Sequence, residues 1–424
     1  MRFYLTVAWR NLFRQGRRTL ITALALSVGV ALCMAMWAFA DGMMGQMFDL
    51  LVTQQLGHVQ VHHPEYPTSH SLYDTIPGAG GRLERLDARP EAGASTGRLV
   101  AFGLVGTQAT SLGARMVGVE PTREDAVTGI SGRIEAGRFL SAGERREGGS
   151  IPVVVGRELA KKLDLGVGGE LVMITQASDG SLANELLEIV GTARTGNAVM
   201  DRAGVYAPLA DLQQVLMLED QVHEIIVLGQ DPEESAALSA VVGEAIADPA
   251  AGPSDVDDLL IRSWSETDPI TAQMMGMTDG MMIVLLLVVF AAAGLGVLNT
   301  MLMAVFERTR ELGLLKALGL KPRQVVLLIL TESGLLGLLA AAGGLVIGLA
   351  VDAYLVAYGV DLSVGEGQGF EYEGVRFDPV IKGIFEWNSV WVTLAMVICV
   401  CLVASLWPSL RAARLRPVDA MRKV

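Results

Sequence analysis

Four long apolar runs divide the chain, at residues 20–40, 281–305, 325–358 and 390–408. The hydrocarbon core of a membrane is about 30 Å thick, and a helix that rises about 1.5 Å per residue crosses it with about 20 apolar residues. The pattern therefore predicts four transmembrane helices. The third run also contains Glu332 and Asp352, and it is long enough to tilt in a bilayer.

The interval 41–280 shows a different period. Val59 and Val61 alternate with His58, Gln60 and His62, which is typical of a half-buried strand. Further strands are predicted at 151–156, 169–174, 185–193 and 223–229, helices at 157–165, 209–218 and 231–247, a loop at 64–81 and a linker at 248–258. The expected fold is an α-helical membrane protein with four transmembrane helices plus a large α+β extracytoplasmic domain between helices 1 and 2.

Composition supports a membrane protein, because 51% of the 424 residues are hydrophobic and the mean hydropathy is +0.43. The orientation follows from the basic residues, which accumulate on cytoplasmic flanks. The segments 1–19, 306–324 and 409–424 hold 15 basic and 3 acidic residues, whereas the rest of the chain holds 18 basic and 43 acidic ones. We therefore expect both termini and the 306–324 loop in the cytoplasm. The domain 41–280 and the short loop 359–389 are expected in the periplasm, and the acidic balance argues against a nucleic-acid partner.

The cysteines and the first apolar run refine this picture. Cys33, Cys399 and Cys401 all lie in apolar runs, so the external domain is expected to depend on its own core without disulfides. The first run lacks a good small-residue cleavage site, so it is expected to be an uncleaved signal anchor.

Candidate chemistry in the external domain is sparse. His58, His62, His63 and His70 are close in sequence, and imidazole is a common metal ligand. On a strand, His58 and His62 would be about 13 Å apart, too far for one ion. We expect no metal site, and a solvated strand edge or a partner surface instead. The sequence contains no HExxH or CxxC motif, so we expect a non-catalytic chain without catalytic residues.

The charged segment FERTRELGLLKALGLKPRQ (306–324) separates the second and third runs. Drawn as one helix, it places five residues on one stripe: Glu307, Glu311, Leu314, Leu315 and Leu318. Gly319 is expected to stop this helix, and Pro322 suits the first turn of the next. The segment is either an ordinary positive turn at the membrane surface or a coupling element that docks on a cytoplasmic partner.

The stretch NTMLMAVFERTRELGLLKALGLKPRQVVLLILTESG (299–334) resembles the signature of the MacB/FtsX superfamily of ABC-transporter permeases. AWRNLFRQGRRTLITALALSVGVAL (8–32) is similar to the family's N-terminal amphipathic helix and first span, and RLRPVDAMRKV (414–424) to its tail. The resemblance implies a MacB-like periplasmic domain. It also implies that 306–324 is an ATPase-coupling helix with these matching positions: Glu307, Arg308, Glu311, Gly313, Lys316, Ala317 and Gly319.

The same resemblance implies a dimer that works by mechanotransmission, in which a cytoplasmic ABC ATPase dimer moves the external domains through the spans. The partner of this chain would be a second permease copy or a paralogue. The sequence contains no GxxxxGK[ST] phosphate loop, so we expect no cofactor on this chain, and ATP and Mg on a separate ATPase.

The segment GHVQVHHPEY after the first span is most like the lipoprotein-releasing permeases of the LolC/LolE type, which hand lipoproteins to a periplasmic carrier. Two alternatives are MacB-like export of peptides or small molecules, with a periplasmic adaptor, and FtsX-like regulation of a cell-wall hydrolase.

For two features inside the spans, Glu332 and the AAAGLG stretch, the sequence allows two interpretations each. Glu332 is a candidate intramembrane functional carboxylate, or else the partner of an interfacial arginine. The small residues of AAAGLG (291–296) allow close approach either between protomers or within one chain.

Overall fold

The computed structural model describes residues 2–14, 16–143, 149–247, 259–363, 371–372, 375–376 and 379–415. The chain divides into two compact units. We call Met1–Gly45, Met275–Asp361 and Val380–Val424 the helical unit, and Gln46–Met274 with Leu362–Pro379 the sheet unit. The expected linker at 248–258 falls outside the described residues.

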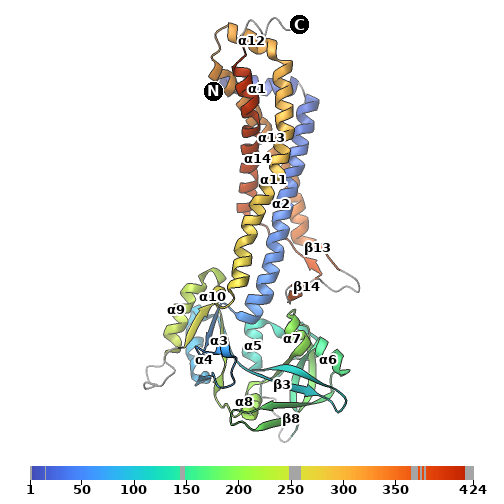
Figure 1. The fold of residues 1–424 in the computed structure, drawn as a ribbon, viewed down its shortest axis with the longest axis vertical. Helices are drawn as coiled ribbons and strands as arrows, with labels where there is room; N and C mark the ends of the chain where they lie inside the picture. Colours follow the sequence, from blue (N-terminus) through green and yellow to red (C-terminus); the bar gives the residue numbers. More distant parts are fainter. Residues whose placement is uncertain are drawn as a thin grey trace. The chain divides into compact units, whose positions relative to one another are not determined.

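The helical unit is built from α1 (Arg2–Arg14), α2 (Gly16–Phe48), α11 (Pro269–Glu307), α12 (Thr309–Ala317), α13 (Pro322–Tyr358) and α14 (Trp387–Ala413). Within the described part of the chain, α2, α11, α13 and α14 are the four helices long and apolar enough to cross a membrane. Figure 1 shows them side by side, with α1 and α12 at one end of the bundle. A short pair, β13 (Val360–Asp361) with β16 (Val380–Ile381), follows α13.

Small residues allow α13 to approach α2 closely. A Cβ atom added to Gly344 would lie 2.5 Å from the Cβ of Val30, and one added to Gly348 would lie 2.5 Å from the sulfur of Met34. In the AAAGLG stretch, Gly294 faces Val400 of α14 in the same chain, whereas nothing lies within 4 Å of the corresponding position at Gly296. Gly294 thus serves packing within the chain.

The sheet unit combines short helices with a large sheet, as expected for an α+β domain. Its helices are η1 (Asp49–Leu56), α3 (Tyr66–Ser69), α4 (Ala79–Asp87), η2 (Pro90–Ala92), α5 (Pro121–Thr128), η3 (Ile130–Arg133), α6 (Arg157–Leu163), α7 (Ala198–Ala203), α8 (Leu209–Leu216), η4 (Pro232–Glu234), α9 (Ser235–Ile246) and α10 (Trp264–Thr267). Its main strands are β1 (Val59–His62), β3 (Ala94–Gly106), β4 (Ser111–Val119), β5 (Ile134–Gly137), β6 (Ile151–Gly156), β7 (Glu170–Gln176), β8 (Leu182–Ala193), β9 (Gly204–Pro208), β11 (Glu224–Leu228) and β12 (Leu260–Ser263). Two short pairs, β2 (Ile76–Pro77) with β10 (Gln221–Val222) and β14 (Glu371–Tyr372) with β15 (Val375–Arg376), complete the described strands.

Six strands close into a ring. The pairing runs from β3 through β4, β9, β6, β8 and β7 and returns to β3. Inward-facing residues such as Met116, Val153, Leu171 and Ile189 fill the ring, as expected for a small barrel. The first half of β3 pairs instead with β11, which continues to β1 and β12. Strand β3 therefore belongs both to the ring and to an extension of the sheet through β11, β1 and β12.

The structure corrects two expectations for the sheet unit. Strand β1 is not half-buried and not an edge, because all four of its residues are buried and it lies between β11 and β12. The predicted loop at 64–81 contains α3 and β2, and α4 begins at its end. Strands β3 and β4, which line the pocket described below, were not among the predicted strands. They contain Gly97, Gly103, Gly113 and Gly118, and glycine weakens a strand pattern in the sequence.

Gly344→Ala is expected to destabilise the helical unit, because the new methyl group has no room against Val30. Overpacking of this kind costs about 1–3 kcal/mol. Gly296→Ala is the matched control, since its methyl group enters open space. Thermal unfolding of the two purified variants in detergent checks this prediction, and equal melting temperatures would contradict it.

Candidate functional site

The charged loop between α11 and α13 contains one short helix, α12, rather than a helix over the whole segment 306–324. Helix α11 continues to Glu307, and Arg308 interrupts the helical path with φ −104° and ψ 14°. Beyond α12, Gly319 adopts φ 102°, which only glycine adopts readily, and Pro322 begins α13. Glu307 and Glu311 therefore lie on different helices.

Arg308 connects the loop to α13. Its Nη1 lies 3.1 Å from Oε2 of Glu332, and its Nε lies 3.3 Å from Oε2 of Glu311. Glu332 is 8% exposed, and a carboxylate in a largely apolar helix is costly unless it is paired. The structure thus gives Glu332 an arginine partner in the 306–324 loop.

Arginines before the first span bind the acidic residues of the loop. Arg14 of α1 donates a 2.6 Å hydrogen bond to Glu311, and Arg18 of α2 lies 3.6 Å from the carboxylate of Glu307. Desolvation alone would raise the pKa of Glu311, but the hydrogen bonds from Arg14 and Arg308 lower it below its ordinary value. The sequence indicated the acids but not these partners, which are almost 300 residues away in the chain.

Lys316 connects α12 to the end of α14. Its Nζ donates hydrogen bonds to the carbonyl oxygens of Ala413, at 2.8 Å, and Leu415, at 2.5 Å. These carbonyls lie at the negative end of the α14 dipole, so a cation there stabilises the helix terminus.

The remaining residues of α12 divide into two faces. Leu312 and Gly313 are buried, whereas Leu314, Ala317, Leu318 and Gly319 are exposed. Leu318 alone is 77% exposed. Glu311 and Lys316 therefore attach α12 to the bundle, and the exposed apolar surface consists of Leu314 and of Leu318 just after the helix.

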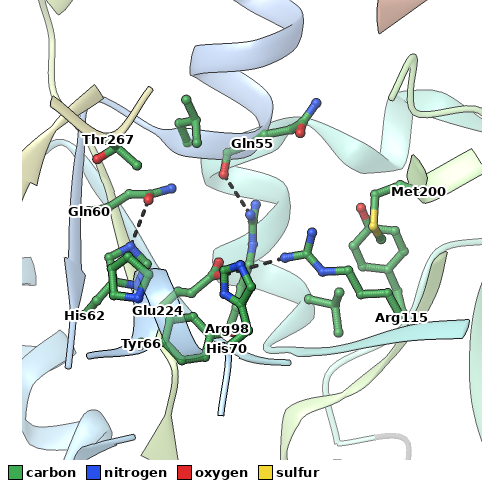
Figure 2. Close-up of a pocket in the computed structure, with 14 residues that line it drawn as sticks. Gln55, Gln60, His62, Tyr66, His70, Arg98, Arg115, Met200, Glu224 and Thr267 are labelled. Atoms are coloured by element: carbon green, nitrogen blue, oxygen red, sulfur yellow. Dashed lines mark hydrogen bonds and ion pairs between the residues drawn. The ribbon is translucent and has the colours of Figure 1, made fainter. Parts of the chain in front are cut away.

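The sheet unit contains a polar pocket with a cavity of about 250 Å³. Strand register aligns three of its ionisable residues in one row, because His62 of β1 is opposite Glu224 of β11, which is opposite Arg98 of β3. Figure 2 shows these residues with Arg115, whose guanidinium group points toward Glu224. The sequence analysis identified His62 in this set but missed Arg98, Arg115 and Glu224, because strand register is not visible in a single sequence.

Arg98 is held by Glu124 of α5. Its Nη2 lies 2.7 Å from Oε1 of Glu124, and its Nε lies 3.1 Å from both carboxylate oxygens. Arg98 also donates a 2.9 Å hydrogen bond to the carbonyl oxygen of Gln55 in η1. Burial alone would lower the pKa of Arg98, but the Glu124 carboxylate raises it, so Arg98 remains charged.

Glu224 is a buried carboxylate opposite Arg115, with 3.6 Å between its Oε1 and Nη2 of the arginine. Burial favours its neutral form, but the positive potentials of Arg115, His62, Arg98 and His223 together outweigh burial and lower the pKa of Glu224. Both groups line the pocket.

All five histidines of the chain lie in the sheet unit, at positions 58, 62, 63, 70 and 223. The ring of Tyr66 stacks between those of His62 and His223, with centroids 5.6 and 4.9 Å away. His58 and His62 are buried, so the expected solvated edge was wrong. Over the described residues, no group of three or more His, Cys, Asp or Glu side chains is arranged to hold a metal ion.

Comparisons with known proteins agree with an architecture of apolar helices and an α+β domain, which is found in a class of membrane permeases. The profile described as MacB-like periplasmic core domain matches residues 19–245, and the one described as FtsX-like permease C-terminal matches residues 273–417. The chain belongs to the MacB/FtsX superfamily of ABC-transporter permeases, and it resembles the LolC/LolE type.

Three relatives illustrate the range of proteins that this chain resembles. The lipoprotein-releasing system transmembrane protein LolC of Neisseria meningitidis serogroup B is 23% identical, over 73% of each chain. The transmembrane protein LolE of the same kind of system, from Haemophilus influenzae, is 20% identical over 98% of each chain. The macrolide export ATP-binding/permease protein MacB of Syntrophobacter fumaroxidans is 29% identical, over 32% of this chain and 21% of the relative.

Acidification is expected to loosen β1 and β11. Burial lowers the pKa of His58, His62 and His223 below 6.5, so the unfolded chain takes up protons that the folded unit does not. Stability contributed by the neutral rings is present above about pH 6.5 and falls as the pH decreases through that value. The lowered pKa of Glu224 places its own loss of stability below about pH 4.5.

Hydrogen exchange of β1 and β11 between about pH 7.5 and 5.5, corrected for the intrinsic exchange rate, measures this effect. The stability of these strands should decrease with pH in the wild type and decrease less in His62→Gln. An unchanged slope in the variant would show that His62 contributes nothing to it.

Proposed function

We propose that this chain is the permease subunit of an ABC transporter that works by mechanotransmission. Its task is to extract lipoproteins from the inner membrane and deliver them to a periplasmic carrier. A cytoplasmic ABC ATPase dimer, which binds ATP and Mg, supplies the movement, and a second permease copy or a paralogue completes the membrane part. Both termini and the 306–324 loop are cytoplasmic in this arrangement, and the sheet unit is periplasmic.

The observation that carries this proposal is the match with LolE, which covers 98% of both chains. The MacB relative, whose name includes ATP binding, is covered over only 21% of its length. Together these facts support an ATPase on a separate chain.

The contacts of α12 support a route for the movement. The exposed leucines of α12 dock on the ATPase, and a shift of α12 acts on α13 through Arg308 and Glu332. The same shift acts on α14 through Lys316 and on α1 through Glu311 and Arg14. In this proposal the bundle and the short helix move together as one rigid body.

A second candidate is MacB-like export of peptides or small molecules through a periplasmic adaptor. It is favoured by the match of the MacB-like core domain over residues 19–245. FtsX-like regulation of a cell-wall hydrolase is a third candidate, in which no cargo is moved.

Affinity purification of the tagged chain from solubilised membranes distinguishes these candidates. We expect mass spectrometry to find an ABC ATPase, a permease partner and acylated lipoproteins. An ATPase with a periplasmic adaptor and no lipoprotein would favour the MacB-like candidate, and a hydrolase the FtsX-like one. Recovery of no ATPase would contradict the proposal as a whole.

Glu311→Lys is expected to weaken ATPase association about tenfold, roughly 1.4 kcal/mol, because it releases one end of α12. Folding should remain intact, since the Arg14–Glu311 pair is exposed and such pairs contribute about 0–1 kcal/mol. The swapped double variant Arg14→Glu with Glu311→Lys should restore association. If the swap restores nothing, Glu311 acts by touching the ATPase directly rather than by holding α12 on α1.

A further inference from the structure

The pocket of the sheet unit contains polar groups that the protein itself leaves incompletely paired. The Nε of Arg115 is buried and has no hydrogen-bond partner among the described residues. The 3.6 Å between Arg115 and Glu224 is an ion pair but is longer than a hydrogen bond. Buried polar groups of this kind are normally satisfied by water or by a ligand.

The charges of the pocket define what complements it. Arg98 is neutralised by Glu124 behind it, and Arg115 faces Glu224. A ligand with a net charge would leave one buried charge without compensation, which is unfavourable. A ligand that carries both signs adds no net charge and can satisfy both members of the open pair.

The geometry of the pocket also limits the spacing of the two charges on the ligand. Because the guanidinium and carboxylate are neighbours, the ligand's carboxylate and ammonium must be neighbours as well, as they are when one carbon atom carries both. A carboxylate can accept from the free Nε edge of Arg115, and charge-assisted bonds of this type are strong. The ammonium can donate to Glu224, which is a pure acceptor when ionised.

The size and walls of the pocket fit the rest of such a molecule. At about 30 Å³ per water, 250 Å³ holds about eight waters or a ligand of similar size. Leu56, Pro67, Val117 and Met200 supply apolar walls, and the stack of His62, Tyr66 and His223 stiffens one side. The space suits a medium aliphatic side chain and is smaller than the 300–1,000 Å³ of pockets for larger ligands.

We propose that this pocket binds a free α-amino acid with an aliphatic side chain, its carboxylate on Arg115 and its ammonium on Glu224. The site is separate from the coupling loop and does not depend on which cargo the transporter moves. Binding would join η1, α3, α7, α10 and five strands around one small molecule.

Calorimetric titration of the full chain in detergent with leucine tests the proposal. Leucine should bind saturably, whereas N-acetylleucine, which lacks the ammonium, and leucinamide, which lacks the carboxylate, should each bind at least tenfold more weakly. Failure of leucine, valine and methionine to bind would overturn the proposal. Equal binding of N-acetylleucine would also overturn it, by showing a site for anions alone.

Variants locate the site. Arg115→Gln and Glu224→Gln should each weaken leucine binding at least tenfold. Arg157→Gln, which removes an exposed arginine paired with Glu135 at 2.7 Å, should change it less than twofold. Undiminished binding in both pocket variants would overturn the assignment. If a pocket variant does not fold, as judged by its melting transition, the wild type still tests the proposal. The test is then the comparison of leucine with N-acetylleucine and leucinamide. Recovery of the ATPase by affinity purification tests the transporter separately.

Discussion

Pairing of a carboxylate with an arginine away from solvent recurs in both units. Glu332 in α13 is matched by Arg308, Glu124 in α5 by Arg98, and Glu224 in β11 by Arg115. Removing either member of such a pair leaves an uncompensated buried charge, which costs far more than a surface pair contributes. In the helical unit this pairing positions the break between α11 and α12. In the sheet unit it keeps α5 on the polar face of β3.

Residues with local consequences were predictable from the sequence. The apolar runs indicated the four long helices, and Gly319 and Pro322 marked the end of the short helix and the start of α13. Pairings over long sequence distances were not predictable. The sequence around Glu311 does not identify Arg14 as its partner, and the sequence around Glu224 does not identify Arg98 as its neighbour. Strand register and tertiary packing determine these contacts.

The error at β1 has the same origin. Alternation of valine with histidine and glutamine indicates one apolar and one polar face, but it does not say whether water covers the polar face. Here Tyr66 and Gln60 shield the ring of His62, and its nitrogens contact Gln60 and the His223 carbonyl. A polar face can be buried when its groups bond to one another, which the sequence pattern alone does not reveal.

The closed ring of six strands limits how sheet units can associate. Along the described path of the main sheet, β12 and β5 are the terminal strands, and each has only four residues. Pairing at β5 is further interrupted by a register shift near Ile134. Short and irregular edges are poor templates for adding another strand. Two copies of this domain therefore have little open backbone to share, and recognition between them falls to side chains, which can separate and rejoin without unravelling a sheet.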